Sequence, residues 1–426
     1  MSEVVAPIVE VVANPLRHPL EPVPDAGPNG RPRGTGPGVG GPSDPTAGPT
    51  AFHRRLPGYA PTPLIDAAAL ATELGVGRLL VKDESSRLGL PAFKMLGASW
   101  ASYRALAAAL EQLTGAAMPE WATLDDLAVL LAPLQPLDLA TATDGNHGRA
   151  VARFAHLFGL GARIDAIVSE GATCEVVAGG TYEDAVARAG QEAGDDCLVV
   201  SDTSWEGYVT VPGWVIEGYT TIFAEIDAQL AAAGLPAPDA VMVQSGVGAL
   251  AGAVAARYRR DPDDPTLFVC VEPTTADCLM ESIRAGEEVE VPGPHHSIMA
   301  GLNCGRPSPV AFGAVSAGFD LFCAIDDDDA VNGMLTLADA GVVSGETGGA
   351  GLGALLAMGG AGGLSLAEGS SVLVMSTEGA TDPAFFQRTV GRSPDQITAD
   401  RPPCVAAGTC PVPRCNGNCA APDVTP

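Results

Sequence analysis

Lysine chemistry is restricted to two positions in this chain. Of its 23 lysines and arginines, only Lys82 and Lys94 are lysines. A lysine amine forms a Schiff base with a carbonyl compound when burial or a nearby cation lowers its pKa. Lys94 stands at the expected start of a long helix, where the helix dipole disfavours a cation, although a surface lysine at a helix end fits this stretch equally well. Lys82 precedes Asp83 and Glu84, which we expect to pair with it and keep it charged.

A polar loop at residues 143–148, TDGNHG, joins an expected strand to an expected helix. Its glycines allow a tight turn, and the amides of such a turn favour anions. Asn146 offers both a donor and an acceptor. Asp144 is a candidate base beside a substrate, and the alternative is that it only caps the helix.

A second glycine loop, Gly246-Val247-Gly248, follows an apolar run and precedes a helix. Such a loop can hold a phosphate through backbone amides. It lacks both the GxGxxG spacing and a GK[ST] sequence, which disfavours ATP and favours a monophosphate such as that of pyridoxal phosphate. Ser376 and Thr377 end a later expected strand, where their hydroxyls either meet a ring nitrogen or serve the turn.

Strands and helices alternate along the chain, which predicts an α/β fold with ligands at the carboxyl ends of parallel strands. We expect strands at 79–82, 137–142, 174–177, 197–201, 240–244, 267–271 and 372–376, and helices at 66–74, 97–113, 124–131 and 149–158. The segment 56–64 is expected to run extended across the surface. After the helix ending near Phe158, residues 163–170 again read as helix, so an expected strand is missing there.

Composition limits the class of protein. A net charge of −28 argues against binding to nucleic acid. The chain has no long apolar run and no signal-like start, so we expect a soluble cytoplasmic protein without a membrane span. No metal site is expected in the body. The tail cysteines lack a CxxC pair, so zinc is a weak hypothesis there; they are Cys404, Cys410, Cys415 and Cys419.

Together these motifs resemble the fold-type II (tryptophan synthase β-like) pyridoxal-phosphate enzymes, which include the serine and threonine dehydratases. Within that group the chain is similar to the diaminopropionate ammonia-lyase family, because Asp144 heads the GNH loop where general threonine dehydratases usually have serine. The resemblance spans about residues 52–386, with a matching opening segment at 13–17. The stretches that carry it are 56–64, 82–94, 143–149, 202–208, 297–302 and 376–382.

This resemblance implies a role for each matching residue. Lys94 would carry pyridoxal 5'-phosphate and act on the L-substrate, Asp144 would be the base for the D-isomer, and Asp202 would lie near the β-amino group of the substrate. The resemblance assigns the cofactor contacts to Asn146 for the ring hydroxyl, Gly246, Val247 and Gly248 for the phosphate, and Ser376 or Thr377 for the pyridine nitrogen. Cys278 and Cys304 match positions that pair in some family members, and we expect thiols in a reducing cytosol.

The implied fold has two doubly wound α/β domains with the cofactor between them. We expect a large domain at 51–96 and 203–392 and a small domain at 97–202. We also expect an N-terminal extension at 1–50, which contains a Pro/Gly-rich disordered insert, and a disordered tail at 393–426. The expected activity is α,β-elimination of 2,3-diaminopropionate to pyruvate and ammonia by a homodimer. One alternative is a serine/threonine dehydratase-like lyase. Relatives carry about a dozen more residues after Ala162, so the other alternative is a catalytically impaired protein of this fold.

Overall fold

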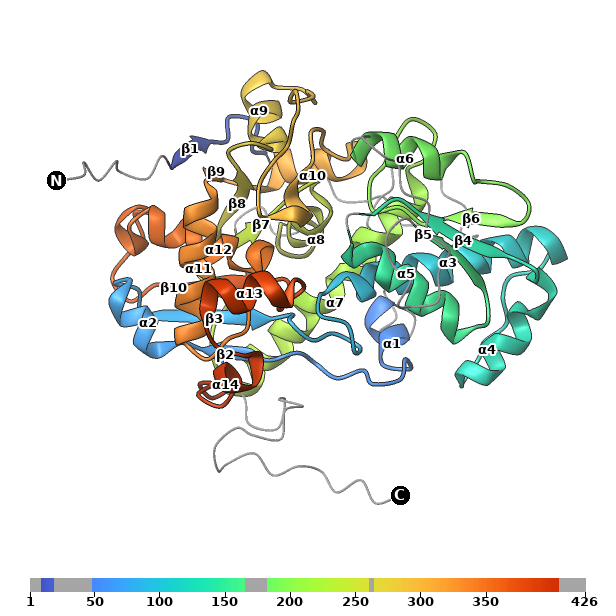
Figure 1. The fold of residues 1–426 in the computed structure, drawn as a ribbon, viewed down its shortest axis with the longest axis horizontal. Coiled ribbons are helices and arrows are strands. Elements are labelled where there is room, and N and C mark those ends of the chain that lie inside the picture. Colours follow the sequence, from blue (N-terminus) through green and yellow to red (C-terminus); the bar gives the residue numbers. More distant parts are fainter. Residues whose placement is uncertain (1–8, 19–47, 144, 165–181, 260–263, 406–426) are drawn as a thin grey trace, which may run out of the picture.

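The computed structural model describes residues 9–18, 48–143, 145–164, 182–259 and 264–405, with backbone alone at 161–164. Two sheets organise them, and helix α7 (Thr210–Ala233) runs between the parts that hold them (Figure 1). The larger sheet has seven strands in the order β1-β9-β8-β7-β10-β3-β2, and the smaller has the order β5-β4-β6. The α/β class and the two-unit arrangement expected from the sequence are therefore present.

The inner strands of the large sheet are parallel, and the edge strands β1 and β2 run antiparallel to their neighbours. The bounds of its strands are β1 (Glu10–Ala13), β2 (Leu64–Asp66), β3 (Arg78–Asp83), β7 (Ala240–Gln244), β8 (Leu267–Pro273), β9 (Leu321–Ile325) and β10 (Ser371–Ser376). The small sheet consists of β4 (Asp138–Thr141), β5 (Gly161–Ile164) and β6 (Cys197–Val199), all parallel.

The inner strands of the large sheet are apolar at successive positions, because both faces of the sheet are buried. Val241 and Val243 of β7 join the core cluster that includes residues of α3, α7 and α8, whereas Ala240 and Met242 join the cluster that includes α12. This alternation is the period of two expected of a strand. The helices around the sheets are α1 (Pro49–His53), α2 (Ala68–Glu73), α3 (Lys94–Thr114), α4 (Leu124–Leu131), α5 (Asn146–Leu157), α6 (Tyr182–Gly190), α8 (Ala249–Tyr258), α9 (Cys278–Ala285), α10 (Pro309–Gly318), α11 (Asp327–Asp339), α12 (Glu346–Ala357), α13 (Pro383–Val390) and α14 (Pro394–Thr398).

Helices α3 and α7 approach each other through glycines. A Cβ on Gly218 would lie 2.6 Å from the carbonyl oxygen of Leu96, and a Cβ on Gly97 would lie 2.5 Å from the ring of Tyr219. His53 of α1 adds a contact from Nε2 to the same Leu96 carbonyl at 2.9 Å. The first turn of α3, which begins with Lys94, is thus fixed against its neighbours.

The expectation that residues 163–170 are helical is wrong at its start. Residues Gly161–Ile164 form β5, which pairs with β4 in parallel register. Gly159, with φ +64°, follows the end of α5 and stops the helix. The edge of β4 then offers hydrogen-bond partners to the backbone of residues 161–164, and this pairing overrides the helical periodicity of the sequence. β5 thus supplies a strand directly after α5, where the sequence was expected to lack one. Residues 165–170 and the strand expected at 174–177 lie outside the described residues, so the expected loss of about a dozen family residues after Ala162 stays untested.

Three further expectations need correction. Segment 56–64 lies only partly at the surface: Pro57 and Gly58 are exposed, whereas Leu56, Thr62 and Leu64 are buried. The extension at 1–50 contributes strand β1 to the large sheet, and residues 19–47 lie outside the described residues. The first part of the tail, expected to be disordered from 393, packs on the molecule: Ile397 of α14 is buried, and the backbone amide of Val405 donates to the carbonyl of Leu64. Residues 406–426 lie outside the described residues.

The expected strands at 79–82, 137–142, 197–201, 240–244, 267–271 and 372–376 are confirmed within one or two residues. The helix at 124–131 is confirmed at its bounds, and the helix expected at 97–113 begins three residues earlier, at Lys94. Among the described residues, no helix is long and apolar enough to cross a membrane.

Candidate active site

Lys94 is placed by the loop that joins β3 to α3. This loop is bonded to the end of β10: the amide of Gly379 donates to the carbonyl of Pro91 at 2.9 Å, and the amide of Phe93 donates to the carbonyl of Thr377 at 3.3 Å. Because β3 and β10 are parallel neighbours, the ends of both strands meet at one edge of the sheet. The loop that leads to Lys94 is therefore held against the strand end that carries Ser376 and Thr377.

The Lys94 ammonium faces a buried carboxylate. Its Nζ lies 2.7 Å from Oδ2 of Asp202, and the Lys94 side chain is 19% exposed. The hydroxyl of Tyr182 donates to Oδ1 of Asp202 at 3.1 Å, and Nδ1 of His147 lies 3.8 Å from Oδ2. Burial alone would raise the pKa of Asp202, but the charges of Lys94 and His147 outweigh it and hold that pKa well below its usual range. Asp202 is therefore an anion beside the amine.

The glycine loop after β7 has the form of an anion site. Gly248, with φ +101°, precedes the first residue of α8. A Cβ on Gly246 would lie 3.0 Å from Sγ of Cys304 and 3.1 Å from the carbonyl of Gly301, so a side chain would not fit there without movement. The carbonyl of Val247 accepts from the amide of Ser308 at 2.8 Å, which fixes the loop. The first amides of a helix lack intrahelical partners and attract a phosphate.

The two strand-end hydroxyls lie in a buried polar cluster. Ser376 Oγ donates to Ser344 Oγ at 2.9 Å, and Thr377 Oγ1 accepts from Nε2 of Gln244 at 3.0 Å. Both hydroxyls lie at the carboxyl end of β10. Which of them faces the ring nitrogen of a cofactor stays a prediction.

Asn146, the first residue of α5, contacts a residue to which the sequence assigned no role. Its Nδ2 donates to Oε2 of Glu378 at 2.6 Å, and Oε1 of Glu378 accepts from the amide of Thr347 at 3.1 Å. Burial raises the pKa of Glu378 to about 7. The nearby Glu346 carboxylate also raises this pKa, whereas the hydrogen bonds from Thr347 and Asn146 lower it. The feature of the sequence that could have pointed to Glu378 is its position directly after Ser376 and Thr377 at the end of β10. Asp144 lies outside the described residues.

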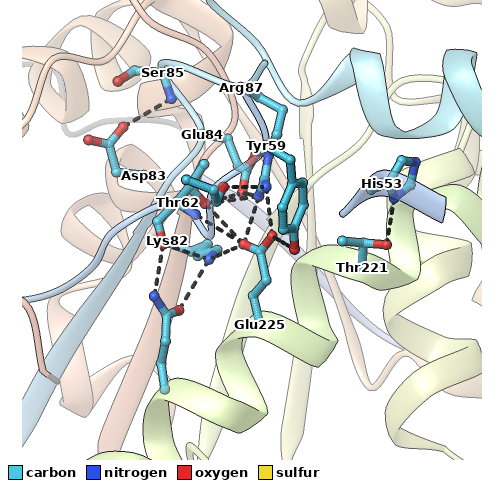
Figure 2. A network of polar contacts seen from close by, with 12 residues as sticks. His53, Tyr59, Thr62, Lys82, Asp83, Glu84, Ser85, Arg87, Thr221 and Glu225 are labelled. Atoms are coloured by element: carbon cyan, nitrogen blue, oxygen red, sulfur yellow. Dashed lines mark hydrogen bonds and ion pairs between the residues drawn. The ribbon is translucent and has the colours of Figure 1, made fainter. Parts of the chain in front are cut away.

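Lys82, the other lysine, is accounted for by a buried polar network (Figure 2). It is fully buried, and its Nζ lies 2.8 Å from Oε2 of Glu225 on α7. The expected partners were wrong: Glu84 pairs with Arg87 at 2.6 Å, and Asp83 pairs with Arg401 at 2.7 Å. Sequence reasoning missed Glu225 because it lies more than 140 positions away in the chain.

Cys278 and Cys304 are both buried close to the glycine loop. Cys278 Sγ lies 3.8 Å from the carbonyl oxygen of Gly246, and Cys304 would meet a Cβ at that glycine. Of the tail cysteines, Cys404 forms a backbone bridge with Ile65, and the other three lie outside the described residues.

These residues fit pyridoxal phosphate as a donor set: a lysine amine, a glycine turn at a helix N-terminus for phosphate and hydroxyls at a strand end. This fold and this site define a fold-type II pyridoxal-phosphate enzyme, and the chain belongs to that family. The family model described as "Pyridoxal-phosphate dependent enzyme" matches residues 55–378. The cofactor of the family is pyridoxal phosphate.

Within the family, the chain is similar to diaminopropionate ammonia-lyase of Escherichia coli K12. The two are 37% identical over 365 residues, which cover 80% of this chain and 89% of that protein. The crystal structure of the selenomethionine-containing holo enzyme from Escherichia coli matches with a TM-score of 0.77 at 32% identity, covering 91% of this chain and 98% of the other. The structure of that lyase in complex with D-serine matches with a TM-score of 0.75 at 31% identity, covering 90% and 97%.

Proposed function

We propose that this protein is a pyridoxal-phosphate-dependent lyase that converts 2,3-diaminopropionate and water to pyruvate and two molecules of ammonia. The observation that carries the proposal is the Lys94–Asp202 pair at 2.7 Å, in a chain similar over most of its length to diaminopropionate ammonia-lyases. Bound pyridoxal phosphate supplies an aldehyde for amines and a ring that accepts the electron pair left when the α-proton departs.

The residues of the chain provide the acid–base and binding parts of the reaction. Lys94 holds the cofactor and then takes the α-proton of the L-isomer, a role that suits an amine at the start of a helix. Asp202 is ionised and already faces an ammonium group. The same carboxylate is suited to the cationic β-amino group of the substrate, which serine and threonine lack. Loss of that group as ammonia and hydrolysis of the released enamine give pyruvate.

We assign the cofactor contacts from the family resemblance. Gly246, Val247 and Gly248 would hold the phosphate, Asn146 the ring hydroxyl, and Ser376 or Thr377 the pyridine nitrogen. Asp144 would take the α-proton of the D-isomer, and the D-serine complex of the Escherichia coli enzyme supports testing D-substrates.

A direct test is pyruvate release from 2,3-diaminopropionate, L-serine and L-threonine at matched concentrations, with both isomers of the diamine. We expect the diamine to be the preferred substrate by kcat/KM. Preference for serine or threonine would favour the dehydratase-like alternative. Cofactor binding without turnover of any of them would favour the impaired alternative.

Family resemblance also leads us to propose a homodimer in the cytoplasm. Light scattering of the purified protein tests the first part, and a single-chain mass would overturn it.

A further inference from the structure

Glu378 joins the two parts of the molecule at the cofactor site. It follows β10 of the large sheet, whereas its partner Asn146 begins α5, directly after β4 of the small sheet. Its backbone also pairs with Ala92, two residues before Lys94. One residue thus contacts the lysine loop, the first turn of α12 through Thr347 and the first turn of α5.

The carboxylate of Glu378 determines how the amide of Asn146 is oriented. An ionised carboxylate only accepts hydrogen bonds, so Asn146 must turn its Nδ2 toward Glu378 and its Oδ1 away from it. The contact between Asn146 and Oε2 is short, at 2.6 Å, and the second oxygen is held by the amide of Thr347. Gly345 packs against this carboxylate: a Cβ there would lie 3.2 Å from Glu378 Oε1. Glu378 is buried, and both of its carboxylate oxygens are hydrogen-bonded.

We propose that Glu378 is a positioning residue for the cofactor: its carboxylate fixes the orientation of the Asn146 amide and ties α5 to the end of β10. The proposal depends on the proposed role of Asn146 as a cofactor contact and is independent of which amino acid is the substrate.

The environment of Glu378 makes this arrangement sensitive to pH. Its pKa is raised by burial to about 7, and Glu346 at the start of α12 is the carboxylate that contributes to the rise. A protonated Glu378 can donate as well as accept, so it no longer forces the orientation of Asn146. The hydrogen bond and the fixed amide are present above the raised pKa and are lost as the pH falls through neutrality.

The test compares Glu378→Gln with the unmodified protein by titrating pyridoxal phosphate into cofactor-free protein and recording the Schiff-base absorbance. We expect the affinity for the cofactor to fall by about tenfold or more, because a hydrogen bond to a charged acceptor is lost. In the unmodified protein we expect the Schiff-base absorbance to change as the pH falls through neutrality, and we expect this change to disappear in Glu378→Gln. Glu217→Gln is the control, since Glu217 is a half-buried carboxylate away from the cofactor site, bonded to Trp100 on α3 at 2.9 Å, and should leave both readouts unchanged.

Unchanged cofactor affinity and an unchanged pH profile in Glu378→Gln would overturn the proposal. If that variant does not fold, Glu346→Gln tests the same idea in a protein that keeps Glu378. Removing the nearby charge should move the spectral transition to lower pH, and a transition that is absent or unmoved would also overturn the proposal. Both readouts concern cofactor binding, so they remain informative if diaminopropionate is not the substrate.

Discussion

Replacing Glu225 by glutamine should destabilise the protein strongly without leaving a cavity. Oε2 of Glu225 lies 2.8 Å from Nζ of Lys82, and Oε1 lies 2.6 Å from Nη1 of Arg87, with all three side chains buried (Figure 2). The carboxylate also accepts from the hydroxyl of Tyr59 and the amide of Thr62. Glutamine keeps the shape but removes one of two buried carboxylates, leaving only Glu84 to face the two cations.

Removing one partner of a buried ion pair costs about 3–5 kcal/mol, because the remaining charge stays buried without compensation. Urea unfolding of the cofactor-saturated protein measures this loss as a change in the free energy of unfolding. Asp339→Asn is the control, since the pair between Arg392 and Asp339 is exposed and should contribute only about 0–1 kcal/mol. Adding Lys82→Met to Glu225→Gln should recover part of the loss, because it removes an uncompensated cation.

Acidification provides a second test of the same network. Burial opposes ionisation of Glu225, but the charges of Lys82 and Arg87 outweigh burial and lower its pKa from 4.5 to about 2. A lowered pKa stabilises the folded protein above the unfolded value and loses that effect as the pH falls through the folded value. The stability gap between wild type and Glu225→Gln should therefore be full above pH 4.5 and close toward pH 2. A gap no larger than that of the surface control, or one unchanged by acid, would refute this reasoning.

Three further predictions concern the elements around Lys94. Gly218→Ala places a Cβ 2.6 Å from the carbonyl of Leu96, so thermal unfolding should show a loss of about 1–3 kcal/mol; no loss would mean that α3 and α7 separate easily. Asp202→Asn keeps the shape but removes the anion beside Lys94, so kcat/KM for diaminopropionate should fall by about 10²–10⁴-fold with the cofactor still bound; full activity would exclude Asp202 from the reaction. Arg401→Met leaves the buried Asp83 carboxylate without its cation, which should lower stability by about 3–5 kcal/mol and would be contradicted by unchanged unfolding.

Local patterns predicted most of the inner strands and helices of this fold. The run Ala240–Gln244 was expected at its observed bounds, because a fully buried parallel strand is a continuous apolar segment. Edge strands were missed for the opposite reason: β2 has three residues, and β1 pairs with β9 through positions more than 300 residues apart. Short strands of this kind are stabilised by their partners, so their own sequence carries little signal.

The residues of the candidate site also divide into those that the sequence alone could indicate and those that it could not. Lys94 and the glycine loop could be named from the sequence because the chemistry restricts the residue types, whereas Asp202 was named from the family resemblance. The partner of Asn146 could not be named, because Glu378 reaches it from the other sheet, 232 positions along the chain. The partners in the Glu225 network could not be named from the sequence either, because the cations come from β3 and the loop after it, while the carboxylate comes from α7.

The most direct test of the central claim is the yield of pyruvate and ammonia from 2,3-diaminopropionate with the wild-type protein and with Lys94→Ala, both supplied with pyridoxal phosphate. The account predicts two ammonia for each pyruvate from the wild type, and no measurable product and no Schiff-base absorbance from Lys94→Ala. Product formation by Lys94→Ala, or none by a cofactor-loaded wild type, would contradict it.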